Sequence, residues 1–177
     1  LVEHSLLLVR HELKKNSVEV ELQFEDDVPE LKIDKAKFEQ VLVNLLINAV
    51  HAMKETLHSK IEIQVSSSKL EGVARDEGMR SAQHLRDGDD VVILSLKDNG
   101  GGISDENLQK IFDPFFTTKS TGVGTGLGLS VVRKIVELHN GGIEVSNRLL
   151  GGVQVSIALK VPNSGRERID MKDENDS

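Results

Sequence analysis

The sequence predicts a two-layer α/β sandwich in which a mixed, mostly antiparallel sheet is covered on one face by helices. Segments with the helical spacing of apolar residues interleave with segments in which apolar and polar residues alternate. Neighbouring alternating segments indicate antiparallel pairs, which argues against a doubly wound parallel sheet. The length of 177 residues, 38% of them hydrophobic, suits one domain with a single core.

The first part of the chain predicts a helix, a strand and a second helix. Apolar residues spaced by four, three and four predict a helix that ends near residues 14–16: Val2, Leu6, Val9 and Leu13. Apolar and polar residues alternate over 18–25, the pattern of a strand with one buried face. Asp34 is a suitable N-cap for a helix over about 35–54, which is apolar around most of its circumference and should be largely buried.

The rest of the chain predicts four more strands and two more helices. Strands are expected at 61–65 and 91–96, and the polar residues 66–90 between them are expected to form a flexible insertion. A short helix should begin near Ser104, and a longer one should run from Leu127 to about His139. Strands at 143–145 and 153–161 complete the predicted domain, residues 1–161, before a charged, disordered tail at 162–177.

Composition excludes several classes of function. The net charge of -7 and the lack of a dense basic patch argue against a nucleic-acid partner. The chain has no cysteine, so disulfides, thiolate nucleophiles and zinc knuckles are excluded, which fits a reducing compartment. We expect a cytoplasmic location for this domain, whether or not the parent protein is anchored in a membrane. No apolar run approaches the roughly 20 residues needed to cross a bilayer, so we expect no membrane insertion by this chain.

Three polar side chains share one stripe of the otherwise apolar second helix. Asn44, Asn48 and His51 are spaced i, i+4 and i+7, which places them on one face. An unpaired buried amide costs about 1–3 kcal/mol, so this polar stripe needs partners. Two interpretations stay open: an internal hydrogen-bond network, or a ligand face where an amide oxygen coordinates Mg²⁺ and an imidazole nitrogen reaches a phosphate.

A glycine turn over 98–103 directly follows the strand predicted at 91–96. Three consecutive glycines at 100–102 let the backbone approach a flat ligand where a Cβ atom would collide. Asp98 can accept a hydrogen bond from an exocyclic amine. The alternative is an ordinary glycine turn closed by the aspartate side chain.

A second glycine-rich segment precedes the helix predicted at 127–139. Gly122, Gly124, Gly126 and Gly128 occur at every second position, so the segment can present backbone N–H groups and the positive end of a helix to an anion. This arrangement favours phosphate binding over a plain linker. The P-loop pattern GxxxxGK[ST] does not occur.

Between the glycine segments, three of the five phenylalanines gather at 112, 115 and 116. We expect Phe112 and Phe115 to anchor this loop to the core, and Phe116 to Lys119 to move with the glycine-rich segment as a lid. Lys119 is a candidate counter-charge for a terminal phosphate, although a solvated lysine is the commoner case.

Taken in order, four segments resemble the motifs of the catalytic ATP-binding domain of sensor histidine kinases. This superfamily also contains gyrase, heat-shock chaperone and mismatch-repair ATPases. Residues 38–49 resemble the asparagine box, 98–103 the first glycine box, 112–116 the phenylalanine box and 124–130 the second glycine box. The resemblance covers about residues 1–161, and four motifs in sequence are far more specific than any one of them.

The resemblance implies a Bergerat fold that binds ATP and Mg²⁺. It implies that Asp98 contacts the adenine amine, that Asn48 ligates Mg²⁺, and that Asn44 and His51 face the phosphates. The residues implied to contact the nucleotide are Asn44, Asn48, His51, Ala52, Asp98, Gly100, Gly102, Ile103, Phe116, Thr118, Lys119, Gly122, Gly124, Thr125, Gly126, Leu127 and Gly128.

Three residues depart from the patterns of this family. His11 imitates the start of the phosphoacceptor motif, but we reject it as the acceptor because its segment leads straight into the first strand, without the family's helical hairpin. Gln40 stands where several relatives place a glutamate general base, and an amide cannot accept a proton at neutral pH. Ala52 replaces an aromatic that stacks on adenine in some relatives.

The resemblance predicts half of a protein-histidine kinase. We expect the γ-phosphate of Mg-ATP to pass to a histidine on an upstream dimerisation hairpin, which this chain lacks, and then to a response-regulator receiver domain. Alone, the chain should bind nucleotide but scarcely phosphorylate itself. The alternatives are an anti-sigma-type serine kinase and a non-catalytic nucleotide-sensing module of the same fold.

Overall fold

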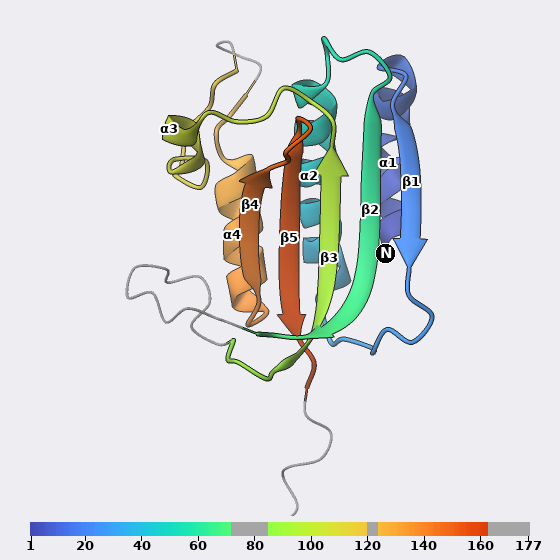
Figure 1. Ribbon diagram of the computed structural model, residues 1–177, viewed down its shortest axis with the longest axis vertical. Helices are drawn as coiled ribbons and strands as arrows, with labels where there is room; N and C mark the ends of the chain where they lie inside the picture. Colours follow the sequence, from blue (N-terminus) through green and yellow to red (C-terminus); the bar gives the residue numbers. More distant parts are fainter. Residues whose placement is uncertain (72–84, 120–123, 163–177) are drawn as a thin grey trace, which may run out of the picture.

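The computed structural model describes residues 1–71, 85–119 and 124–162, and it has the predicted two-layer sandwich (Figure 1). In chain order the elements are α1 (Val2–Lys15), β1 (Glu19–Phe24), α2 (Lys35–Ala52), β2 (Lys60–Lys69), β3 (Asp90–Asp98), α3 (Asp105–Leu108), α4 (Gly128–Leu138), β4 (Gly142–Asn147) and β5 (Val153–Lys160).

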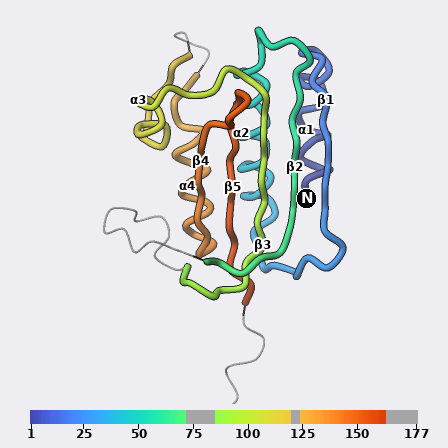
Figure 2. The backbone as a smooth tube through the Cα atoms, viewed as in Figure 1, coloured from blue at the N-terminus to red at the C-terminus, as the bar shows by residue number. Residues whose placement is uncertain are grey.

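The strands form one five-stranded sheet in the order β1-β2-β3-β5-β4. Strand β1 runs parallel to β2, and the other neighbouring pairs are antiparallel, so the sheet is mixed and mostly antiparallel as predicted. Helices α1, α2 and α4 lie on one face of the sheet (Figure 2). Asp98 is the last residue of β3, the middle strand, so the glycine turn leaves from the centre of one end of the sheet.

The start of α2 is fixed by its cap and by a contact with α4. The Asp34 side chain accepts a hydrogen bond from the Lys37 N–H at 3.1 Å, as predicted for the N-cap. The Asp34 N–H donates to His139 Nε2 at 3.1 Å, and the His139 ring meets Phe38 edge to face, with 4.8 Å between centroids. These contacts hold α2 against the helix that follows the glycine-rich segment.

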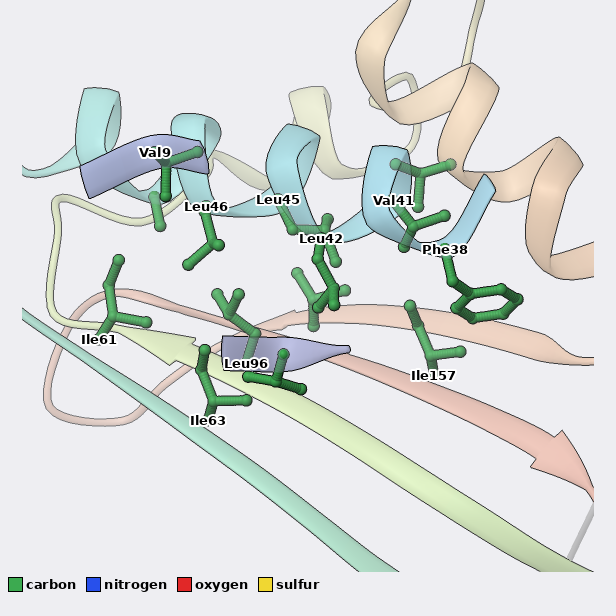
Figure 3. Close-up of a cluster of buried hydrophobic side chains, with 14 of the residues drawn as sticks. Val9, Phe38, Val41, Leu42, Leu45, Leu46, Ile61, Ile63, Leu96 and Ile157 are labelled. Atoms are coloured by element: carbon green, nitrogen blue, oxygen red, sulfur yellow. The ribbon is translucent and has the colours of Figure 1, made fainter. Parts of the chain in front are cut away.

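Helix α2 is the centre of the core. Figure 3 shows its leucines pointing toward side chains of β2, β3 and β5, among them Ile63, Leu96 and Ile157. Leu42 and Leu46 are buried, and α2 also packs between α1 and α4. Full burial of each such side chain contributes about 1.5–3 kcal/mol, so the position of α2, and of its polar stripe, is well determined.

Two strands differ from their predicted form. The apolar face of β1 was expected to be buried, but while Val20 packs against the core, Leu22 and Phe24, farther along this edge strand, are exposed. Strand β2 continues through Lys69, inside the expected insertion 66–90, because Ser66 to Lys69 pair with β3. Residues 72–84 and 163–177 lie outside the described residues, as does Gly122. No helix among the described residues is long and apolar enough to cross a bilayer.

Candidate functional site

A lysine from the loop before the glycine-rich segment reaches the polar stripe of α2. The Lys119 ammonium donates to Asn48 Oδ1 at 3.0 Å and lies 2.9 Å from His51 Nδ1. An ammonium group has no acceptor, so Nδ1 of His51 is the unprotonated nitrogen of a neutral imidazole. The stripe therefore offers an amide oxygen and an imidazole nitrogen to one cation.

Electrostatics favour the neutral imidazole. Burial lowers the pKa of His51, and the nearby charges of Lys119 and Lys54 lower it further, against the opposing effect of Glu12. Burial also lowers the pKa of Lys119, with a contribution from Lys54. Asn48 Oδ1 and His51 Nδ1 thus act as electron-pair donors, and the cation that they contact is the Lys119 ammonium.

Asp98 is a buried carboxylate with one oxygen engaged. Its side chain is 4% exposed, and Oδ1 accepts hydrogen bonds from the N–H groups of Gly100 at 2.9 Å and Val153 at 3.2 Å. Among the described residues, Oδ2 accepts no hydrogen bond. Burial raises the pKa of Asp98, while these hydrogen bonds and Arg148 oppose the rise. Oδ2 is not fully enclosed by protein atoms, so it can accept a hydrogen bond from a ligand amine.

The glycine turn packs against the C-terminal end of α2. Gly101 N–H donates to the carbonyl oxygen of Ala52 at 3.4 Å, and a Cβ atom at Gly100 would lie 2.6 Å from that oxygen. Gly102 has a φ of +79°, which favours glycine. The turn and the polar stripe therefore meet at one end of α2.

The glycine-rich segment brings the start of α4 beside the same stripe. A Cβ atom at Gly128, the first residue of α4, would lie 3.4 Å from Asn44 Oδ1 and 4.0 Å from Asn48 Nδ2. Gly126 has a φ of +67°, and its carbonyl accepts a hydrogen bond from Phe115 N–H at 2.9 Å. The positive end of α4 thus lies next to two of the three stripe residues.

The other described residues of the predicted lid contact their own loop segments. Thr118 and Thr125 are both exposed, and Thr125 Oγ1 accepts a hydrogen bond from Leu127 N–H at 3.3 Å. A Cβ atom at Gly124 would lie 2.5 Å from Thr117 Oγ1, so this glycine packs against the loop that carries Lys119.

Phe112 and Phe115 were expected to anchor their loop to the core, and the prediction is wrong for Phe115. Phe112 is partly buried, and the guanidinium carbon of Arg133, on α4, lies 5.4 Å from its ring centroid. Phe115 is 74% exposed, because its φ of +69° and its backbone hydrogen bond to the glycine-rich segment direct the side chain outward. Phe116 is partly buried.

The residues that imitate catalytic groups lie off the stripe. His11 and Gln40 are exposed, on α1 and α2. Glu39 Oε1 lies 2.8 Å from His4 Nδ1 of α1, so the carboxylate next to Gln40 is turned toward α1. No group of three or more metal-ligating side chains forms among the described residues, so a cation here would take oxygen ligands from elsewhere.

The connection between β4 and β5 contacts the glycine turn, and no predicted site residue lies in it. Val153 N–H reaches the Asp98 carboxylate, and Arg148 Nη1 donates to the Asp98 carbonyl at 2.9 Å. The one sequence signal is the glycine pair at 151–152, between the strands predicted at 143–145 and 153–161.

Residues 33–163 match the family model described as histidine kinase-, DNA gyrase B- and HSP90-like ATPase. The chain belongs to this ATPase family. The match runs from α2 through β5 and includes the stripe, the glycine turn and the glycine-rich segment, and it supports ATP as the ligand.

Named relatives of this ATPase domain are sensor kinases. The chain is 36% identical to sensor histidine kinase ZraS of Escherichia coli K12 over 161 residues, 91% of this chain and 30% of that protein. It is 31% identical to signal transduction histidine-protein kinase AtoS of the same strain over 169 residues, 96% of this chain and 24% of that protein. The chain thus spans less than a third of these relatives.

A solved structure confirms the fold. The catalytic domain of histidine kinase ThkA, in a nucleotide-free form, aligns with a TM-score of 0.67 and 29% identity, covering 90% of this chain and 89% of that domain. The predicted fold class and the resemblance to histidine-kinase ATP-binding domains are therefore confirmed.

Proposed function

We propose that this ATPase domain binds Mg-ATP and presents its γ-phosphate to a histidine on a dimerisation hairpin elsewhere in the same protein. One observation carries the proposal: an amide and imidazole stripe, a buried carboxylate and a helix N-terminus converge at the end of α2 in a chain of this family. The relatives ZraS and AtoS, both named histidine kinases, support this choice of reaction.

In the proposed complex, each part of the site has one role. Asp98 accepts a hydrogen bond from the adenine amine, and Ile103 and Ala52 line the adenine slot with the glycine turn. Asn44 and His51 face the phosphates, and the N–H groups of Gly124 to Gly128 wrap them at the positive end of α4. Catalysis is mostly positioning and charge neutralisation, as phosphoryl transfer requires.

The residues present fit a divalent cation. Asn48 Oδ1 already contacts a cation, the Lys119 ammonium, at 3.0 Å. An amide oxygen suits Mg²⁺, with phosphate oxygens and water supplying the remaining ligands. Bound Mg²⁺ would neutralise phosphate charge, and Lys119, displaced from Asn48, would be free to pair with the terminal phosphate.

Neither of the two candidates for a general base on α2 suits that role, as the proposal of half an enzyme requires. Gln40 cannot accept a proton, and Glu39 is paired with His4. We therefore infer that the carboxylate beside the acceptor histidine, outside this chain, serves that role. His11 is not the acceptor in this scheme.

The phosphate is then proposed to pass to a response-regulator aspartate. One solved relative is histidine kinase ThkA in complex with response regulator protein TrrA, at 27% identity and a TM-score of 0.64, covering 90% of this chain and 39% of that chain. Because the proposed reaction consumes ATP, we infer that residues 1–161 work as a domain on the cytoplasmic side. The net charge of -7 argues against a nucleic-acid partner.

The test is phosphoryl transfer from γ-labelled ATP in the full-length protein and in this chain alone. We expect an acid-labile, base-stable phosphoprotein in the full-length protein and almost no label in the isolated chain. An acid-stable label would indicate a serine kinase, and tight ATP binding without any transfer would indicate a sensing module. Labelling of the isolated chain that disappears in His11→Ala would contradict the rejection of His11.

A further inference from the structure

We propose that the end of β4 and its connection to β5 hold the adenine side of the site in its binding conformation, with Asn147, the last residue of β4, as the main positioning residue. The inference rests on the proposed function, because it concerns the glycine turn that follows Asp98. Both segments lie at the same end of the sheet, where the chain leaves β3 and where β4 returns into β5 (Figure 2).

Asn147 fastens the far end of the glycine turn with both halves of its amide. Its Oδ1 accepts a hydrogen bond from Ile103 N–H at 2.8 Å, and its Nδ2 donates to the Ile103 carbonyl at 2.6 Å. This two-point contact joins residues 44 positions apart and reproduces the hydrogen-bond pair of a β-ladder. Among the described residues, no other hydrogen bond reaches Ile103 or Gly102.

The residues that follow Asn147, in the connection to β5, hold the other end of the turn, at Asp98. Arg148 Nη1 donates to the Asp98 carbonyl at 2.9 Å, and its Nη2 lies 3.8 Å from Glu62 of β2. Gly152, with a φ of +88°, passes so close that a Cβ atom there would collide with the Asp98 carbonyl oxygen. Asn147 and the connection that follows it therefore hold both ends of the turn, at 103 and at 98.

The middle of the turn needs this support. Its three glycines have the greatest backbone freedom of any residues, and the contact from Gly101 N–H to Ala52 is long, at 3.4 Å. If only a fraction of molecules hold the turn in the binding conformation, the apparent dissociation constant rises in inverse proportion to that fraction. Among the described residues, the side-chain hydrogen bonds of Asn147 go to Ile103, on the adenine side, so its effect should be the same for any adenine nucleotide.

The experiment compares calorimetric affinities of the purified 177-residue chain for ATP and ADP, each with Mg²⁺. We expect Asn147→Ala to weaken both about tenfold, leaving their ratio unchanged. Asn147→Asp keeps the acceptor for Ile103 N–H but loses the donor, so its loss should be intermediate. Ser146→Ala, an exposed neighbour on β4, is the matched control and should bind as the unsubstituted chain does.

Affinities are compared at a temperature where circular dichroism shows every variant fully folded, so that a purely structural role would leave them unchanged. Asn147→Asp carries the test if Asn147→Ala does not fold. If the unsubstituted chain binds ATP and a folded Asn147 variant binds it with the same affinity, the positioning role is overturned and the proposed function is not. Absence of ATP binding by the unsubstituted chain overturns the proposed function as well.

Discussion

At the scale of single residues, Asp98 is placed where function and stability conflict. Its carboxylate is buried at the end of β3, and burial raises its pKa above the ordinary value of 3.8. Above that pH, Asp98 therefore carries a proton more often in the folded chain than in the unfolded chain. The free energy of unfolding contributed by Asp98 falls as pH rises from about 3.8, so the charged group destabilises the fold at neutral pH.

Asp98→Asn should therefore leave the ligand-free chain at least as stable as before at pH 7. The amide keeps an acceptor for the Gly100 and Val153 N–H groups, and it removes the buried charge. Denaturant unfolding at several pH values measures the effect as the difference between variant and unsubstituted chain. That difference should shrink toward pH 3.8, and a clear loss of stability at pH 7 would contradict this view of Asp98.

A second prediction for single residues concerns the effect of Lys119 on the pKa of His51. Burial and the Lys119 charge hold this pKa below 6.5, so removal of the lysine in Lys119→Ala should raise it. An imidazole with a lowered pKa costs stability as pH falls below 6.5, and the variant should lose less stability in acid. An NMR titration of the His51 ring checks the shift.

Lys110→Ala is the matched control for this titration. Lys110 pairs with Glu106 on α3 at 2.9 Å, away from the stripe, so its removal should leave the His51 titration unchanged. If Lys119→Ala also left it unchanged, the contact between Lys119 and the stripe would not exist in solution.

At the scale of elements, the glycine turn offers a pair of adjacent substitutions with opposite outcomes. A Cβ atom at Gly100 would lie 2.6 Å from the backbone oxygen of Ala52, whereas one at Gly101 meets nothing within 4 Å. Gly100→Ala should push the turn away from α2 and weaken ATP binding by more than tenfold, because the adenine slot shifts as a unit. Gly101→Ala should fold like the unsubstituted chain and bind ATP more tightly than Gly100→Ala, as calorimetry would measure. Equal affinities in the two variants would contradict the packing of the turn on α2.

The elements also mark where prediction from sequence succeeds and fails. Helix α2, with its Asp34 cap, was predictable because cap, periodicity and length all agree. The exposure of Leu22 was not, because alternation does not tell an edge strand from a central one. The outward direction of Phe115 follows from a left-handed backbone conformation that no local pattern announces.

At the scale of the whole molecule, the candidate site forms where three distant segments meet at one end of α2. The stripe, the glycine turn and the glycine-rich segment were each predicted from local sequence patterns and their order along the chain. These patterns did not predict that Lys119 contacts Asn48, or that Asn147 and Arg148 hold the turn, because these contacts span 71, 44 and 50 positions. The contacts of Asn147 and Arg148 follow from the sheet order, with β5 beside β3, which becomes evident only in the folded chain.

The most direct test of the account is calorimetric titration of Mg-ATP into the unsubstituted chain and into Asp98→Asn. We predict that the unsubstituted chain binds, and that the variant binds at least tenfold more weakly while melting no lower, since a hydrogen bond to a charged group is worth about 1.5–3 kcal/mol. Equal affinity in the two proteins would contradict the assignment of Asp98, and with it the adenine site.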